Sequence, residues 1–197
     1  MIIWLNGAFG AGKTQTAYEL HRRLPNSHVF DPENAGYYIR KNVPKEAARP
    51  DFQDYRMWRE INYAFLKYLD QEYGGTLIVP MTVVSPAYFA EIVGRLRADG
   101  VVVQHFALCV TKETLLRRLR SRGERNSWAV RQIDRCIEGL ADEAFRDHLQ
   151  TDDLTIPAVA ETIAARLGLD LQPDRRSGLA RFKDRILTQI RHIRFFP

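Results

Sequence analysis

Short apolar runs alternate along this chain with longer stretches in which apolar residues recur at helical spacing. Runs of this length that are rich in β-branched residues favour strands. The five expected strands are Ile2–Leu5, His28–Phe30, Thr76–Val84, Val101–Val110 and Asp147–Gln150. Strands that alternate with helices predict an α/β fold with a five-stranded parallel sheet flanked by helices.

Two details of the pattern refine this expectation. In the third run, odd and even positions alike are apolar, as in a strand that is covered on both faces. Pro80 is expected at the end of this strand or at a bulge. Before it, a helical stripe is expected to face the core. Its members are Trp58, Ile61, Phe65 and Leu69.

A phosphate-binding loop follows the first strand directly. The residues are Gly7, Ala8, Phe9, Gly10, Ala11, Gly12, Lys13 and Thr14, which spell GxxxxGK[ST] between a strand and a helical run. Glycines let the backbone N–H groups point at phosphate oxygens, and the positive end of the following helix adds its field. This loop predicts ATP binding, with Lys13 on the β- and γ-phosphates and the Thr14 hydroxyl at a Mg²⁺ position.

The residues after the second strand point to a kinase. The chain has no NKxD-type guanine signature, and no acid closes the third strand at residues 80–82. Instead Asp31 ends the second strand, where it would face the transferred phosphoryl group and act on the attacking hydroxyl. Glu33 is the neighbouring alternative, as the base or as a group near the Mg²⁺ waters, and an Asp-Pro turn or a helix cap is the structural alternative for Asp31.

An arginine-rich segment after the fourth strand predicts a lid over about residues 112–135. Helical projection places Arg118 and Arg122 beside the buried leucine stripe, and it turns Arg117 and Arg120 away from it. Guanidinium groups in such a lid neutralise charge that develops on the phosphoryl group. A solvated basic helix face is the alternative reading of the first pair.

The composition changes the picture in one respect. The net charge of +5 lies entirely in residues 173–197, which hold seven of the 29 basic and two of the 24 acidic residues. The remaining chain is balanced, so no nucleic acid partner is expected. The five histidines and two cysteines show no metal-ligand spacing, so any metal should arrive with the nucleotide.

The chain resembles the tunicamycin resistance proteins, which are P-loop kinase-like ATP-binding proteins. The resemblance is carried by the stretches IIWLNGAFGAGKTQTAYELHRRL, FDPENAG, DFQDYRMWREINY, LIVPMTVV, ETLLRRLRSR, NSWAVRQIDRCIEGL and QTDDLTI. It implies a P-loop kinase fold and ATP-dependent protection against tunicamycin, a uridine-containing nucleoside antibiotic that carries a fatty acyl chain. Phosphorylation of a drug hydroxyl is the chemistry that the resemblance suggests, and sequestration of the drug without turnover is the alternative, as is a kinase of another small sugar or nucleoside.

Acceptor binding is expected mainly between the second and third strands. Aromatic faces and polar groups there suit a uracil and sugars. The candidates are Glu33, Tyr37, Arg40, Asp54 and Trp58, together with Thr82 after the third strand. Tyr37 and Trp58 have core packing as their alternative reading.

The basic tail predicts an amphipathic helix over about residues 177–194. Residues 1–172 would form the kinase domain, and residues 173–197 the added helix. Its apolar stripe would be Leu179, Phe182, Ile186, Leu187, Ile190 and Ile193. The helix either docks on the domain or makes peripheral contact with an anionic membrane surface. With no signal peptide pattern and no membrane-spanning run, a cytoplasmic location is expected.

Overall fold

Five parallel strands form the centre of the molecule in the order β2-β3-β1-β4-β5. The computed structural model describes residues 1–192, without the side chains of Phe182, Arg185 and residues 189–192. The strands are β1 (Ile2–Gly7), β2 (Ser27–Val29), β3 (Thr76–Pro80), β4 (Val103–Cys109) and β5 (His148–Gln150). The predicted five-stranded parallel sheet is therefore confirmed, and Pro80 ends β3, four residues before the predicted end.

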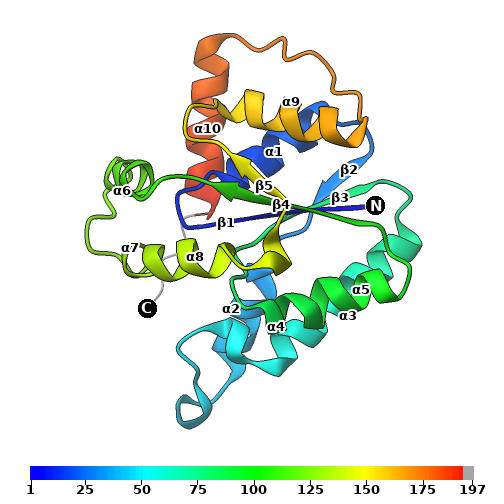
Figure 1. Cartoon of the computed structure of the whole chain (residues 1–197), viewed down its shortest axis with the longest axis vertical. Coiled ribbons are helices and arrows are strands. Elements are labelled where there is room, and N and C mark those ends of the chain that lie inside the picture. Colours follow the sequence, from blue (N-terminus) through cyan, green and yellow to red (C-terminus); the bar gives the residue numbers. More distant parts are fainter. Residues whose placement is uncertain (193–197) are drawn as a thin grey trace.

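Helices cover both faces of the sheet (Figure 1). They are α1 (Lys13–Arg23), α2 (Glu33–Asn42), α3 (Arg56–Glu72), α4 (Pro86–Phe89), α5 (Arg95–Ala98), α6 (Lys112–Arg120), α7 (Trp128–Arg131), α8 (Ile133–Leu140), α9 (Ile156–Leu167) and α10 (Gly178–His192). A π-helical segment, Ala90–Gly94, joins α4 to α5, and three short 3₁₀ turns lie at Lys45–Ala47, Phe52–Asp54 and Glu143–Phe145.

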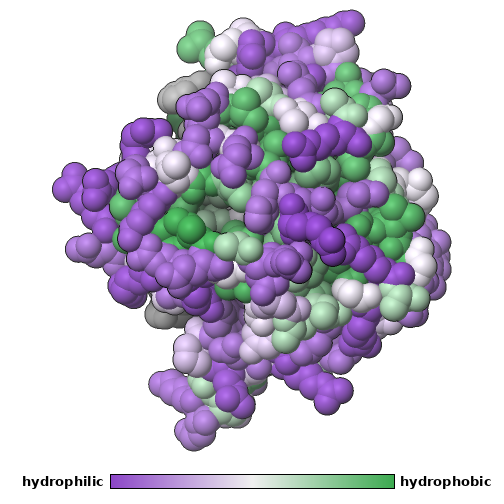
Figure 2. All heavy atoms as spheres, viewed as in Figure 1, coloured by the Kyte–Doolittle hydropathy of each residue, from purple (hydrophilic) through white to green (hydrophobic). Residues whose placement is uncertain are grey.

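The central strand shows why two cores form. Successive residues of a strand point to opposite faces, so Ile2 and Trp4 of β1 enter the core under α3–α5, whereas Ile3 and Leu5 enter the core under α1 and α9. All four side chains are fully buried. In Figure 2 hydrophobic surface is seen chiefly in the middle band of the molecule, where the sheet lies between its helices.

Helix α3 departs from the predicted stripe. Trp58 and Leu66 are fully buried, but Phe65 is 50% exposed, and Arg59 and Asn62 are buried in its place. The expectation that Phe65 faces the core is wrong, because the buried face of α3 follows Trp58, Asn62 and Leu66 at intervals of four residues. An apolar ring is thus left at the surface.

The tail folds back onto the sheet's helical layer. Helix α10 lies beside α1 (Figure 1), and the Arg176 guanidinium binds Glu19 of α1 at 2.7 Å, where Glu19 is only 3% exposed. Of the expected stripe, Leu179, Ile186 and Leu187 are exposed; the side chains of Phe182 and Ile190, and Ile193 entirely, lie outside the described residues. These described members of the stripe are therefore not buried against the domain as expected, although α10 contacts α1.

Among the described residues, no helix combines the length and the apolar character that crossing a membrane requires.

Candidate active site

The phosphate-binding loop lies between the carboxyl end of β1 and the start of α1. Three of its glycines have positive φ values, 146° at Gly7, 87° at Gly10 and 101° at Gly12. A side chain would be strained at these angles, and a Cβ at Gly7 would also lie 3.0 Å from the Leu108 carbonyl oxygen. The backbone conformation of the loop therefore requires glycine at these three positions.

Lys13 closes the loop on itself. Its Nζ donates to the carbonyl oxygens of Gly7 at 2.8 Å and Ala8 at 3.0 Å, and it lies 5.6 Å from the centroid of the Phe9 ring. Burial lowers the pKa of Lys13 to about 8, while the charges of Cys136 and Glu33 act to raise it and that of Arg122 acts to lower it. Glu33 and Arg122 therefore lie within electrostatic reach of this ammonium group.

Two buried polar side chains form hydrogen bonds with the backbone at the start of the phosphate-binding loop. Asn6 donates from Nδ2 to the Val83 carbonyl at 2.7 Å and accepts from the N–H groups of Gly7 and Val83. Thr82 donates from its hydroxyl to the Gly7 carbonyl at 2.8 Å. These bonds tie the start of the loop to the segment that follows β3.

Thr82 therefore does not serve as the expected acceptor contact. Its side chain is 4% exposed, and its carbonyl accepts from Gln53 Nε2 at 3.0 Å. Thr82 and Gln53 instead connect the phosphate-binding loop to the insertion between β2 and α3. Sequence reasoning missed Asn6 and Gln53, whose partners lie far along the chain.

Asp31 and Glu33 follow β2, at the same carboxyl end of the sheet at which the phosphate-binding loop follows β1. One Asp31 carboxylate oxygen accepts from the Glu33 N–H at 3.0 Å, so Asp31 caps the start of α2. Glu33 accepts from the Tyr37 hydroxyl at 2.8 Å, one turn further along α2. The structural reading of Asp31 as a cap is thus realised, and the cap fixes where both carboxylates stand.

Trp58 is a core residue and not an acceptor contact. It is fully buried, and its indole Nε1 donates to the Pro32 carbonyl at 2.9 Å. Zero exposure leaves no surface for a ligand, so the expectation of direct binding is wrong. Trp58 instead anchors the backbone between Asp31 and Glu33.

The other acceptor candidates line the insertion. Tyr37 packs edge-on against Phe52, and the Arg40 guanidinium lies 5.3 Å from the same ring. Arg40 also donates to the Pro50 carbonyl at 2.8 Å, and the exposed Asp54 accepts from the Tyr88 hydroxyl at 3.0 Å. These contacts give the insertion a fixed shape beside Glu33.

Arg118 contacts the backbone of the phosphate-binding loop. Its guanidinium donates at 3.4 Å to the carbonyl oxygens of Gly10, Ala11 and Thr151. Arg117 and Arg120 are exposed, and Arg117 bonds to Thr114 of its own helix. Helix α6 ends at Arg120, so Arg122 stands in the following turn, and its charge acts to lower the pKa of Lys13.

A second contact joins the lid segment to the loop. The Trp128 ring of α7 packs against Phe9, with centroids 5.1 Å apart and the planes at 72°. Sequence reasoning did not single out Trp128. An aromatic residue in a polar, arginine-rich segment was the signal that could have found it.

The protein provides few groups that could bind a magnesium ion near the phosphate-binding loop. The described residues contain no cluster of three or more His, Cys, Asp or Glu side chains suited to a metal. Thr14, partly exposed at the second residue of α1, offers one hydroxyl. That donor set fits Mg²⁺ bound mainly by nucleotide phosphates and water.

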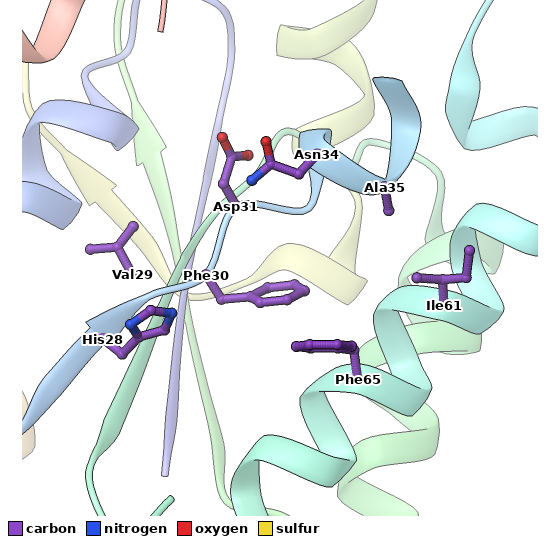
Figure 3. Close-up of a pocket in the computed structure, with 8 residues that line it drawn as sticks. All are labelled: His28, Val29, Phe30, Asp31, Asn34, Ala35, Ile61 and Phe65. Carbon is purple, nitrogen blue, oxygen red and sulfur yellow. The ribbon is translucent and has the colours of Figure 1, made fainter. Parts of the chain in front are cut away.

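A groove of about 390 Å³ opens beside Asp31 (Figure 3). It runs along edge strand β2 toward α3, and Asp31 and Asn34 stand at one end of it. Its lining is His28, Val29, Phe30, Asp31, Asn34, Ala35, Ile61 and Phe65.

Known proteins resemble this chain in sequence and in fold. Residues 2–143 match the AAA domain family. The tunicamycin resistance protein of Deinococcus radiodurans is 39% identical; the match covers 87% of this chain and 98% of that one, with a TM-score of 0.76. Among curated proteins the chain has no significant match.

More distant structures share the fold. The shikimate kinase of Bacteroides thetaiotaomicron is 18% identical over 86% of this chain and 99% of its own, with a TM-score of 0.56. The APS kinase CysC of Mycobacterium tuberculosis, solved with AMPPNP and APS, is 15% identical over 85% and 96%, with a TM-score of 0.58. The fold is thus one that kinases use.

Proposed function

Because this chain belongs to the tunicamycin resistance proteins and to the AAA domain family, we propose that it is a kinase that transfers the γ-phosphoryl group of ATP to a hydroxyl group of tunicamycin. The observation that carries the proposal is the meeting of two groups at one edge of the sheet. The phosphate-binding loop with Lys13 follows β1, and Asp31 and Glu33 follow β2, so both groups come after the carboxyl ends of parallel strands in one sheet. Since ATP is the donor, the proposed reaction belongs in the cytoplasm.

In the proposed reaction the hydroxyl oxygen of the drug attacks the γ-phosphorus, and the bond to the β–γ bridging oxygen of ATP breaks. The loop N–H groups and Lys13 hold the β- and γ-phosphates. Asp31 or Glu33 accepts the hydroxyl proton, since both follow β2 at the acceptor side. Arg118, 3.4 Å from the Gly10 and Ala11 carbonyls, is placed to neutralise charge on the transferred group.

Mg²⁺ held by Thr14 and the phosphates supplies charge neutralisation of the triphosphate when it is bound. The protein groups that act beside it are Lys13 and the lid arginines. Tyr37 and Arg40 border the acceptor side and shape the insertion through Phe52.

A second function is ATP-dependent sequestration of the drug without turnover. One observation favours it: the segment that follows β3 carries Met81 and Thr82 where many ATPases have an acid, and the Thr82 hydroxyl donates to the Gly7 carbonyl. In that case the closed nucleotide complex would hold the drug stoichiometrically.

The test is direct incubation of the purified protein with tunicamycin, ATP and Mg²⁺, followed by mass spectrometry of the drug. A kinase yields a drug mass increased by one phosphoryl group, in many-fold excess over enzyme, with matching ADP release. Lys13→Met serves as the control and should give neither. Tight, ATP-dependent drug binding with no mass change would establish sequestration and overturn the kinase proposal.

A further inference from the structure

The groove beside Asp31 has an apolar floor and a polar end. Phe30, which follows β2, and Phe65 of α3 stack on one another along it, with ring centroids 5.6 Å apart and planes at 23°. Ile61 and Ala35 complete the apolar wall, whereas Asp31 and Asn34 point away from these rings at one end (Figure 3). The groove is therefore amphipathic along its length.

Its apolar surface is left open to solvent. Phe65 is 50% exposed, and its neighbour Tyr68, whose ring packs against Phe65, is 55% exposed. The same helix buries Arg59 and Asn62. Neighbouring exposed aromatic rings beside a groove offer an apolar contact surface to a ligand.

We propose that this groove binds the aliphatic chain of an amphiphilic acceptor, with the hydroxylated head of that molecule at Asp31. The inference rests on the proposed function for the head, and it adds a place on the protein for the fatty acyl chain that this acceptor carries. Such a chain needs no hydrogen-bond partner, and most side chains of the lining are apolar; Asp31, Asn34 and His28 are its polar members.

Chain chemistry fits this lining better than sugar chemistry does. A sugar in the groove would leave its hydroxyl groups against Phe30, Ile61 and Phe65, which offer no partner. Each methylene buried there tightens binding about fourfold. The groove would thus supply affinity while Asp31 and Glu33 meet the reacting end.

The test compares tunicamycin with its deacylated, chain-free form. Binding to the full chain with a non-hydrolysable ATP analogue is measured by calorimetry, and phosphoryl transfer by mass spectrometry. Phe65→Ser removes the half-exposed ring, Phe65→Leu restores an apolar wall, and Val102→Ser changes an equally exposed apolar residue far from the groove. Thermal unfolding of each variant verifies the fold.

We expect the wild-type protein to bind tunicamycin at least about 10²-fold more tightly than the chain-free form. Phe65→Ser should weaken the binding of tunicamycin but not that of the chain-free form, so that most of the difference in affinity is lost. The KM for tunicamycin should rise with kcat nearly unchanged. Phe65→Leu and Val102→Ser should retain the wild-type difference in affinity. Equal binding of both ligands by the wild-type protein, or equal losses for both in Phe65→Ser, would overturn the groove assignment.

The outcomes also separate the groove from the reaction. Chain-dependent binding that needs Phe65, without phosphoryl transfer, supports the groove and refutes the kinase. Transfer to both forms at equal KM supports the kinase and refutes the groove. A change of molecular mass in light scattering on Phe65→Ser, with drug binding unaltered, would assign the groove to contact between two copies of the chain and overturn the proposal.

Discussion

Lys13 couples nucleotide binding to pH. Its ammonium group donates to the carbonyl oxygens of Gly7 and Ala8, and burial lowers its pKa to about 8. Bound phosphates require the protonated form, so raising the pH from 7 to 9 should weaken ATP binding by about tenfold, with about one proton taken up on binding at pH 9. Calorimetry in two buffers of different ionisation enthalpy measures this uptake.

The same group affects stability in the opposite direction. Between about pH 8 and 10.5 the unfolded chain holds the Lys13 proton that the folded chain has released, so this group's contribution to the free energy of unfolding rises with pH. Lys13→Met should abolish both dependences. Proton uptake that persists in this variant would assign it to another group.

Asp31 and Glu33 can be separated by amide substitutions. Asp31→Asn keeps an acceptor for the Glu33 N–H, so the cap and the fold should survive. If Asp31 is the base, turnover falls by about 10²- to 10⁴-fold with ATP binding intact, and Glu33→Gln has a smaller effect. Steady-state turnover rates and ATP affinities of the two variants distinguish these roles. A larger loss of turnover in Glu33→Gln than in Asp31→Asn would make Glu33 the base and leave Asp31 as the cap.

Residue roles that depend on neighbouring positions were predictable, and those that depend on distant partners were not. The phosphate-binding loop is spelled out within residues 7–14, and its φ values agree with that spelling. Asn6 acts through Val83, 77 positions away, and Gln53 through Thr82, 29 positions away. Trp58 was ambiguous for the same reason, since its buried bond to Pro32 is a tertiary contact.

At the scale of elements, the lid gives the sharpest comparison. Arg118 reaches the phosphate-binding loop from α6, whereas Arg120 on the same helix is exposed. Arg118→Ala should therefore lower kcat by about 10²- to 10³-fold, and Arg120→Ala should leave it within about twofold. Rapid-quench or steady-state kinetics measures both; similar losses in the two variants would refute a specific role for Arg118.

The sequence predicted where helices occur better than it predicted which face of a helix is buried or where the helix ends. Periodicity placed α3, but apolar residues at 61 and 65 competed with buried polar ones at 59 and 62. Arg59 bonds to Glu91 and to the Gln53 carbonyl, outside the helix, whereas Asn62 donates to the Trp58 carbonyl one turn earlier in α3. Helical projection likewise carried α6 through Arg122, whereas the chain turns after Arg120 and Gly123 adopts a φ of 83°. Local pattern fixes the existence of an element better than its face or its end.

For the whole molecule, the tail is expected to act as part of the fold. Deletion of residues 175–197 removes Arg176, which binds the buried Glu19, and removes the cover of α10 from α1. We expect the melting temperature to fall by about 5 °C or more. The intact protein should stay in the supernatant when anionic vesicles are sedimented at low salt.

A matched substitution separates the ion pair from the helix. Arg176→Ala should reproduce part of the loss, since Arg22 and Arg23 still pair with Glu19. A truncated protein as stable as the intact one, together with sedimentation of the intact protein with vesicles, would return α10 to the membrane alternative.

The contact between Trp128 and Phe9 gives this protein an optical reporter. Of its three tryptophans, Trp4 and Trp58 are fully buried and Trp128 is 41% exposed. Collisional quenching of fluorescence by acrylamide should therefore act almost entirely on Trp128, at the place where the lid segment meets the phosphate-binding loop. Nucleotide-dependent movement of the lid can then be timed in a stopped-flow instrument without any label, with Trp128→Phe as the silent reference.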